Sequence, residues 1–134
     1  LAHLKSETEH LNFFEDLQCC YRPSLLLPLW RLAGFLTGWL PALVGNKAVF
    51  ATIEAVETFV DEHYRNQIKA LIPHVTREPE RGVLAGFEYC RLEEVHHRDD
   101  ARQRSASKKP LYLRLWMNLV GTGSQLAVKF ARAI

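Results

Sequence analysis

Glutamate precedes histidine by three residues at two well-separated places in this chain. The matches are Glu7/His10, Glu93/His96 and an overlapping pair, Glu94/His97. In an α-helix, residues at this spacing share a face, with Cβ atoms about 5–6 Å apart. A carboxylate and a neutral imidazole placed in this way can bind one metal ion, and the imidazole nitrogen suits iron, zinc or copper.

A single Glu-x-x-His match would be explained by a solvated helix face. Eleven glutamates and six histidines scattered at random over 134 positions would give fewer than one match on average. Two separated matches in segments with helical patterning therefore indicate a metal site. We assign His97 itself to the surface or to orienting a ligand carboxylate, because ligands normally have such partners.

Glu57 is a third candidate ligand. It lies at the edge of an apolar stripe that includes Ile53 and Val60, and a carboxylate buried alone is costly unless a cation compensates it. Two-metal carboxylate bundles use two Glu-x-x-His helices and two helices with a single glutamate, so this sequence lacks one glutamate. Glu54 and Asp61 share nearly the same face and could substitute, although a solvated or hydrogen-bonded role is the expectation for both.

The elements that would position these residues are helices. Apolar spacing and Pro or Gly breaks predict helices over 2–18, 25–44, 47–72, 83–103 and 111–134. Polar connectors are expected at 73–82 and 105–110, the second of them solvated, and a break at 22–24. The predicted fold class is all-α, a helical bundle, and the length suits a single domain over 1–134.

Composition gives no support to several functional classes. A net charge of +2 gives no argument for a nucleic-acid partner. Three cysteines without a C-x-x-C motif support neither a disulfide framework nor a zinc knuckle, so a reducing compartment is expected. The chain begins at Leu1 rather than Met, and we expect an upstream segment.

The apolar segment 25–44 is long enough to approach the thickness of a bilayer. Arg31 within it would cost roughly 2.5–3.5 kcal/mol at a membrane centre, and Pro28 and Pro41 would disturb a spanning helix. A buried helix of a soluble protein is one alternative, but an amphipathic helix lying in the membrane interface fits better. The predicted membrane and substrate contacts are Leu29, Trp30, Phe35, Trp39 and, in the last helix, Trp116.

Several segments together resemble the demethoxyubiquinone hydroxylase family of ubiquinone biosynthesis. They are LLPLWRLAGF (26–35), ALVGNK (42–47), EAVE (54–57), HYRNQI (63–68) and LEEVHH (92–97). The resemblance extends over the whole chain in the right order. It implies a ferritin-like, membrane-associated di-iron monooxygenase.

The resemblance also implies particular residues. The metal ligands would be Glu7, His10, Glu57, Glu93 and His96. The family has a further ligand-bearing helix, which would precede residue 1 and is missing from this chain. His63 and Tyr64 follow Glu57, and Tyr64 lies about two turns from it on the same face. This pair could relay protons or electrons, or could be a packed tyrosine beside a hydrogen-bonded histidine.

The implied activity is hydroxylation of the ring of demethoxyubiquinol by two Fe ions and O2. NADH would be the ultimate electron donor, although no G-x-G-x-x-G or P-loop motif is present. The expected partners are a prenylated quinol, the membrane surface, other proteins of ubiquinone biosynthesis and further copies of the chain. The expected location is peripheral on a bacterial cytoplasmic or mitochondrial inner membrane. Two alternatives are another ferritin-like di-iron protein (a quinol oxidase or an iron store) and a non-catalytic helical bundle at the membrane.

Overall fold

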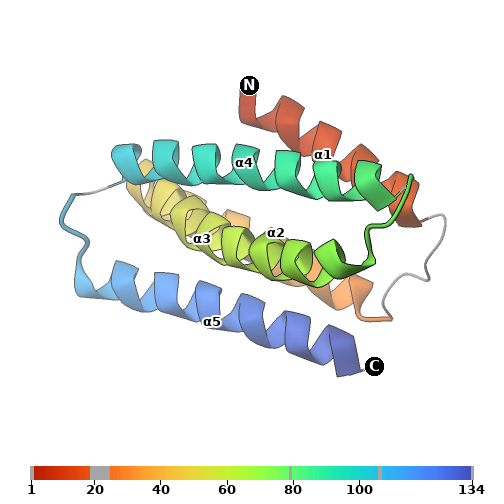
Figure 1. The fold of residues 1–134 in the computed structure, drawn as a ribbon. Coiled ribbons are helices and arrows are strands. Elements are labelled where there is room, and N and C mark those ends of the chain that lie inside the picture. The colour runs from red at the N-terminus through yellow and green to blue at the C-terminus, as the bar shows by residue number, and fades with distance from the viewer. Residues whose placement is uncertain (1, 19–24, 79, 106, 134) are drawn as a thin grey trace. The chain divides into compact units, whose positions relative to one another are not determined.

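The computed structural model describes residues 2–18, 25–78, 80–105 and 107–133. Their elements are α1 (Ala2–Gln18), α2 (Leu27–Val44), α3 (Asn46–Leu71), the 3-10 turn η1 (Ile72–His74), α4 (Glu80–Arg104) and α5 (Leu111–Ala133) (Figure 1). No strand occurs in these ranges, which confirms the prediction of an all-α fold. The predicted break at 22–24 lies outside the described residues.

The helices are divided between two compact units. The first contains residues 1–23 and 60–96, and the second contains residues 24–59 and 97–134. The long helices α3 and α4 therefore each contribute one part to each unit. The prediction of a single domain over 1–134 stays a prediction.

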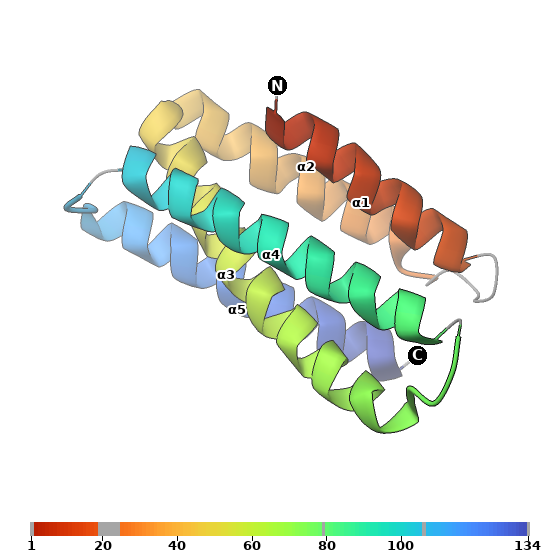
Figure 2. The ribbon, with the colours of Figure 1, turned by 45° about the horizontal axis from the view of Figure 1, so that its top comes forward.

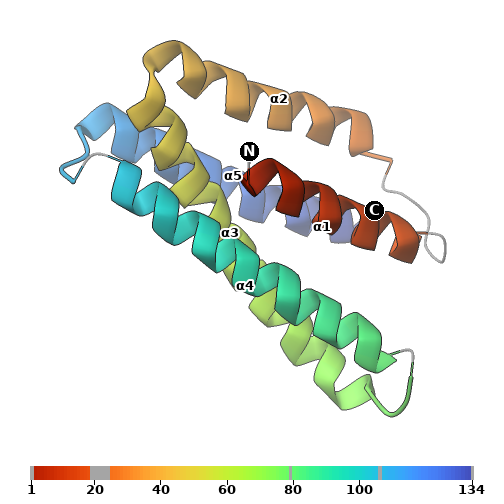
Figure 3. The same cartoon turned by 90° about the horizontal axis from the view of Figure 1, so that it is seen from above.

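The first unit is held together by a cluster of aromatic side chains. Tyr64, Phe87 and Cys90 are buried at its centre. The Phe14 ring stacks on Tyr64 with ring centroids 6.1 Å apart, and Phe87 meets Tyr64 edge-on at 5.8 Å. These rings join α1 to the second part of α3 and the first part of α4, which lie side by side (Figure 3). Burial of so much aromatic surface is the main stabilising contribution in this unit.

A buried carboxylate joins α3 to α4 within the same unit. Asp61 is 4% exposed and accepts hydrogen bonds from Arg65, one turn further along α3, and from Arg91 of α4. Burial by itself raises the pKa of Asp61, but the hydrogen bonds and charges of Arg91 and Arg65 outweigh this effect and lower the pKa overall. Asp61 therefore has the hydrogen-bonded role expected from the sequence.

The second unit begins with α2 and a sharp reversal into α3 (Figure 2). Gly45 ends α2 with φ of 125°, a conformation that residues with a Cβ rarely adopt. After the reversal, Ala48 and Ala51 of α3 pack against Leu113 of α5. These small side chains allow the two helices to approach closely.

Polar contacts fix the connector between α4 and α5 in the second unit. Glu54 is buried, and its carboxylate accepts hydrogen bonds from Arg102 and Ser105 and forms a 3.0 Å ion pair with Lys109. Burial alone raises the pKa of Glu54, but Lys109, Arg102 and Ser105 lower it overall. The expectation of a simply solvated connector over 105–110 is wrong at Ser105 and Lys109, because the buried carboxylate recruits both.

Helix α2 exposes most of its apolar side chains. Only Pro41 among its residues is buried, and α2 is the one helix of the described ranges long and apolar enough to cross a membrane by length and composition. The same test is passed by core helices and by signal sequences, so it does not decide between a spanning and an interfacial helix.

Candidate metal centre

One face of α4 is buried along most of its length. The buried residues recur at alternating spacings of three and four: Phe87, Cys90, Glu94, His97 and Ala101. This spacing defines one helix face. It places two polar residues, Glu94 at 5% exposure and His97 at 6%, in the middle of an otherwise apolar stripe.

Glu94 contacts a histidine of α1. Its Oε1 lies 3.0 Å from Nδ1 of His10, which is itself 4% exposed. An ionised carboxylate can only accept a hydrogen bond, so the contact assigns the proton of the neutral imidazole to Nδ1. Nε2 of His10 is buried and has no hydrogen-bond partner in the described part of the chain. A buried imidazole nitrogen with an available lone pair is a typical metal donor.

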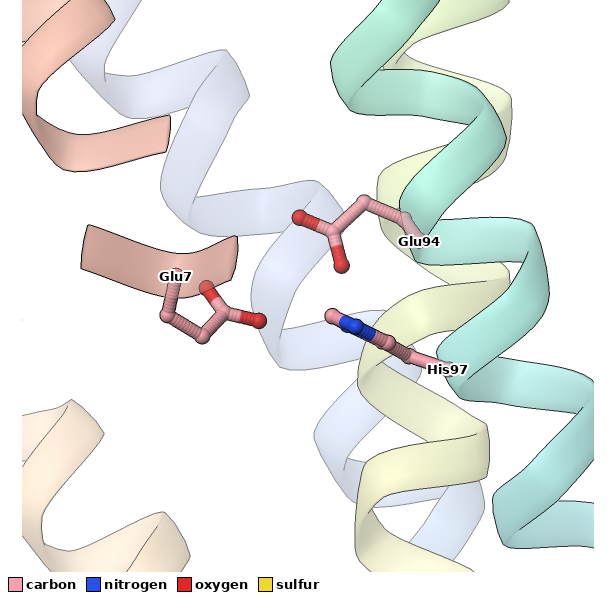
Figure 4. Close-up of side chains that lie close together, drawn as sticks. All are labelled: Glu7, Glu94 and His97. Atoms are coloured by element: carbon pink, nitrogen blue, oxygen red, sulfur yellow. The ribbon is translucent and has the colours of Figure 1, made fainter. Parts of the chain in front are cut away.

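Glu7, Glu94 and His97 each offer one donor atom within 4.8 Å of the others. Glu7 and Glu94 belong to the first unit, and His97 follows Glu94 by one turn on the same continuous helix. Figure 4 shows these three side chains pointing toward one another. Glu7 is the exposed member of the group.

The chemistry of these donors fits a metal ion such as iron. Two carboxylates and two imidazoles offer the oxygen and nitrogen donors that iron accepts. The 3.0 Å between Nδ1 of His10 and Oε1 of Glu94 is a hydrogen-bond distance, so Nε2 is the nitrogen of His10 that would be available to a metal ion. Because Glu94 adjoins both His10 and His97, its carboxylate would help to hold an ion bound by either imidazole.

Cys90 lies one turn before Glu94 on the buried face. Burial and the charges of Glu94 and Glu7 raise the pKa of its thiol to about 11, and a hydrogen bond with Tyr64 acts in the opposite direction. A raised pKa disfavours the thiolate, which is the form that a nucleophilic cysteine needs. Cys90 instead connects the hydroxyl of Tyr64 to the turn that carries Glu94.

Glu93 and His96 lie on a different face of α4. Their neighbours one turn earlier, Tyr89 and Leu92, are 51% and 61% exposed. His96 is exposed, Glu93 is half-buried, and the charge of Glu93 is the first cause of a raised pKa at Tyr89. Neither residue belongs to the group formed by Glu7, Glu94 and His97.

The other residues proposed from the sequence are placed as follows. Glu57 is half-buried on α3 and belongs to the second unit. His63 is half-buried, and Tyr64 is buried in the aromatic cluster of the first unit. The ligand role of Glu57 and the relay role of His63 and Tyr64 stay predictions.

The predicted membrane contacts differ in exposure. Leu29, Phe35 and Trp39 are exposed on α2, and the Phe35 and Trp39 rings stack with centroids 6.3 Å apart. Trp30 and Trp116 are half-buried. The indole N–H of Trp116 donates a 2.8 Å hydrogen bond to the hydroxyl of Thr52.

The sequence predicts His97 at the surface or behind a ligand. The structure buries it beside Glu94, so the surface position is wrong, whereas a position behind a ligand stays a prediction. The spacing of Phe87, Cys90 and Ala101 is a sequence signal for the buried face of α4. Steps of three and four residues from Cys90 reach Glu94 and His97 rather than Glu93 and His96.

The chain is thus an all-α protein in which carboxylate and imidazole donors of α1 and α4 lie close together. The sequence profile of the family described as "Ubiquinone biosynthesis protein COQ7" matches residues 1–131. A match over nearly the whole chain shows that the chain belongs to this family.

Named relatives agree with the family. The chain is 34% identical over 124 residues to "NADPH-dependent 3-demethoxyubiquinone 3-hydroxylase, mitochondrial" of Rattus norvegicus, covering 91% of this chain and 56% of the rat protein. It is 34% identical over 131 residues to "3-demethoxyubiquinol 3-hydroxylase" of Rhodospirillum rubrum, covering 96% of this chain and 59% of that protein. The chain therefore spans little more than half the length of these relatives.

Proposed function

We propose that this chain takes part in the O2-dependent hydroxylation of the demethoxyubiquinol ring, with iron held by its carboxylate and imidazole groups. The observation that carries the proposal is the convergence of Glu7, Glu94 and His97 beside His10 in a member of the COQ7 family. The names of the relatives support the substrate and the reaction.

The proposed ligands are Glu7, His10, Glu94 and His97, with Glu57 as a further candidate on α3. Glu94 and His97 take the place of Glu93 and His96 in the ligand set, because their burial and their contact with α1 side chains favour them. Bound iron would supply the activation of O2 for insertion of one oxygen atom into the substrate ring.

The remaining residues near the site would exclude water and could pass protons. Phe87 and Cys90 of the aromatic cluster lie on the buried face of α4, about two turns and one turn before Glu94, and would keep water from that end of the site. The Tyr64 hydroxyl hydrogen-bonds the Cys90 thiol. This arrangement supports a proton relay through Tyr64, with the half-buried His63 as its neighbour.

The reaction requires two electrons, because the second oxygen atom of O2 leaves as water. A reduced nicotinamide cofactor is the proposed source. The family resemblance implies NADH, whereas the rat relative is named as NADPH-dependent, so both cofactors belong in an assay.

We propose that α2 and α5 bring the chain to a membrane that contains the prenylated quinol. Both helices expose many long apolar side chains, and large contiguous apolar patches on a protein surface mark interaction sites. The proposed location is peripheral on a bacterial cytoplasmic or mitochondrial inner membrane. Other ubiquinone-biosynthesis proteins and further copies of the chain are the proposed protein partners.

Complementation tests the activity. The full-length coding sequence is expressed in cells that lack the hydroxylase and accumulate the demethoxy precursor, and their quinones are measured by mass spectrometry. Restored ubiquinone is the expected result. A well-expressed protein that leaves the precursor unconverted would remove the hydroxylase proposal.

Iron analysis separates the alternatives. A di-iron centre predicts about two iron atoms per chain after anaerobic loading with Fe(II) and desalting. Iron without hydroxylated product would favour a quinol oxidase or an iron store. Absence of bound iron in the full-length protein would favour a non-catalytic membrane bundle.

A further inference from the structure

The second unit contains an apolar pocket for which no role has been assigned. Its volume is about 220 Å³, and it lies between the C-terminal part of α2 and the first turns of α3 and α5. Its lining residues are Leu40, Pro41, Val44, Ala48, Tyr112, Leu113 and Trp116.

The lining offers almost nothing to a polar ligand. No charged side chain lines the pocket. The indole N–H of Trp116 donates to Thr52, and the hydroxyl of Thr52 donates to the carbonyl oxygen of Ala48, each at 2.8 Å. A peptide, carboxylate or phosphate entering here would lose hydration without a partner, at a cost of roughly 2–7 kcal/mol per amide or hydroxyl group and more for an ion. The pocket therefore selects an uncharged hydrocarbon.

The size of the pocket limits the length of that hydrocarbon. An apolar cavity of about 150 Å³ holds benzene, which has six carbon atoms. In proportion, the pocket of about 220 Å³ holds about nine carbon atoms. This is close to two isoprene units of five carbons each.

The entrance to the pocket continues the exposed apolar face of α2. Val44 is 64% exposed and Tyr112 is 61% exposed, whereas Ala48 at 6% and Leu113 at 3% are buried. A chain arriving along the face of Leu36 and Leu40, which are 38% and 40% exposed, would thus meet apolar surface as far as the small side chain of Ala48. The hydrogen bond to Thr52 holds Trp116 in place beside this path.

We propose that this pocket binds about two isoprene units of the prenyl tail of the quinol substrate. The inference rests on the proposed function, since that function supplies a substrate with a long, branched and uncharged tail. It goes further by assigning the tail to the end of the second unit where Ala48, Leu113 and Trp116 meet.

Binding of farnesol, a free prenyl alcohol, tests the pocket without iron or turnover. Isothermal titration compares the wild-type protein with Ala48→Leu, which fills the pocket, and with Ala42→Leu, the same change at an exposed position of α2 outside the lining. The expected result is a dissociation constant at least tenfold weaker for Ala48→Leu and within about twofold of wild type for Ala42→Leu, because the added methyl groups occupy the site only at position 48.

A second variant covers the case in which Ala48→Leu fails to fold. Val44→Trp narrows the entrance from an exposed position, so no buried residue has to repack, and weaker farnesol binding is again expected. Unchanged affinity for farnesol in Val44→Trp and in any folded Ala48→Leu would overturn the inference. Tighter binding of unbranched dodecanol than of farnesol would also overturn it, because it would assign the pocket to a lipid acyl chain. If filling the pocket abolishes farnesol binding but the protein has no hydroxylase activity, the proposed function is refuted. The pocket then remains a prenyl-binding site.

Discussion

Nδ1 of His10 and Oε1 of Glu94 lie 3.0 Å apart in a buried contact between residues 84 positions apart in the sequence. The contact fixes the register of α1 against α4 in the first unit and leaves the other nitrogen of His10 buried, without a hydrogen-bond partner among the described residues. Such an arrangement is costly in a purely structural core. It is favourable where a cation binds, and this supports the proposal of Glu94 and His97 as the ligands on α4.

The first prediction separates the two overlapping Glu-x-x-His pairs on α4. Glu94→Gln and His97→Ala should each lower the iron content of Fe(II)-loaded protein about tenfold or more, since loss even of an outer partner of a ligand typically costs 10–100-fold. Glu93→Gln and His96→Ala carry the same chemical changes on the more exposed face and should retain iron. Elemental analysis of the four folded variants measures the difference, and iron lost from the Glu93 and His96 variants alone would return the ligand role to them.

The second prediction concerns Asp61 and its two arginines. Asp61→Asn should lower the free energy of unfolding at pH 7 by about 2 kcal/mol, because charge-assisted hydrogen bonds are lost while Arg65 and Arg91 can still reach water. Denaturant unfolding followed by circular dichroism measures this loss. Glu62→Gln, an exposed change on the same helix, is the matched control and should stay within about 0.5 kcal/mol.

The same variant should respond differently to acid. The folded protein holds the pKa of Asp61 below its usual value of 3.8, so the unfolded chain binds the proton first as the pH falls. The stabilisation is therefore complete above about pH 5 and is lost as the pH falls through the folded pKa. The stability difference between wild type and Asp61→Asn should shrink below pH 4, and a difference that stayed constant down to pH 2 would contradict this account.

Local sequence signals predicted most of the helices well. The first predicted helix, 2–18, has the bounds of α1, and Pro73 ends the α3 segment, where the chain turns through η1. The start of α4 was placed at residue 83, but the helix begins at Glu80, where an acidic side chain suits the positive end of the helix dipole. Spacing and breakers act over a few residues, which is why the sequence alone was sufficient for these elements.

The rotation of α4 about its axis could not be read from local signals. Glu93/His96 and Glu94/His97 have the same spacing, and adjacent residues on a helix point about 100° apart. Some apolar residues of α4, such as Leu92, are exposed, so counting apolar positions does not identify the buried face of the helix. What decides the rotation is the contact of Glu94 with His10, a tertiary interaction between distant segments. Similarly, nothing near Lys109 in the sequence indicates its ion pair with Glu54.

The third prediction uses the close approach of α1 and α4. A Cβ added at Gly86 would collide with the ring of Phe13, whereas a Cβ at Gly38 in α2 would meet nothing within 4 Å. Gly86→Ala should destabilise the protein by about 1–3 kcal/mol, because Phe13 must leave its place in the aromatic cluster. Gly38→Ala should stabilise it by up to about 1 kcal/mol through helix propensity. Thermal unfolding of both variants checks the opposite signs, and stabilisation by Gly86→Ala would show that the ring moves without cost.

The final prediction tests membrane binding through α2. Phe35 and Trp39 stack on each other and are 63% and 48% exposed, so replacing both with lysine should leave the fold intact and remove much of the apolar surface available to a bilayer. In flotation with vesicles of phosphatidylcholine and phosphatidylglycerol, the wild-type protein should rise with the lipid, and the double variant should remain at the bottom. Lysine adds positive charge, which by itself favours anionic lipid, so release would identify apolar insertion as the main attraction.

Leu92→Lys, a change of the same kind at an exposed position of α4, should float like the wild type. Equal flotation of the double variant and the wild type would place the membrane contact elsewhere than on α2.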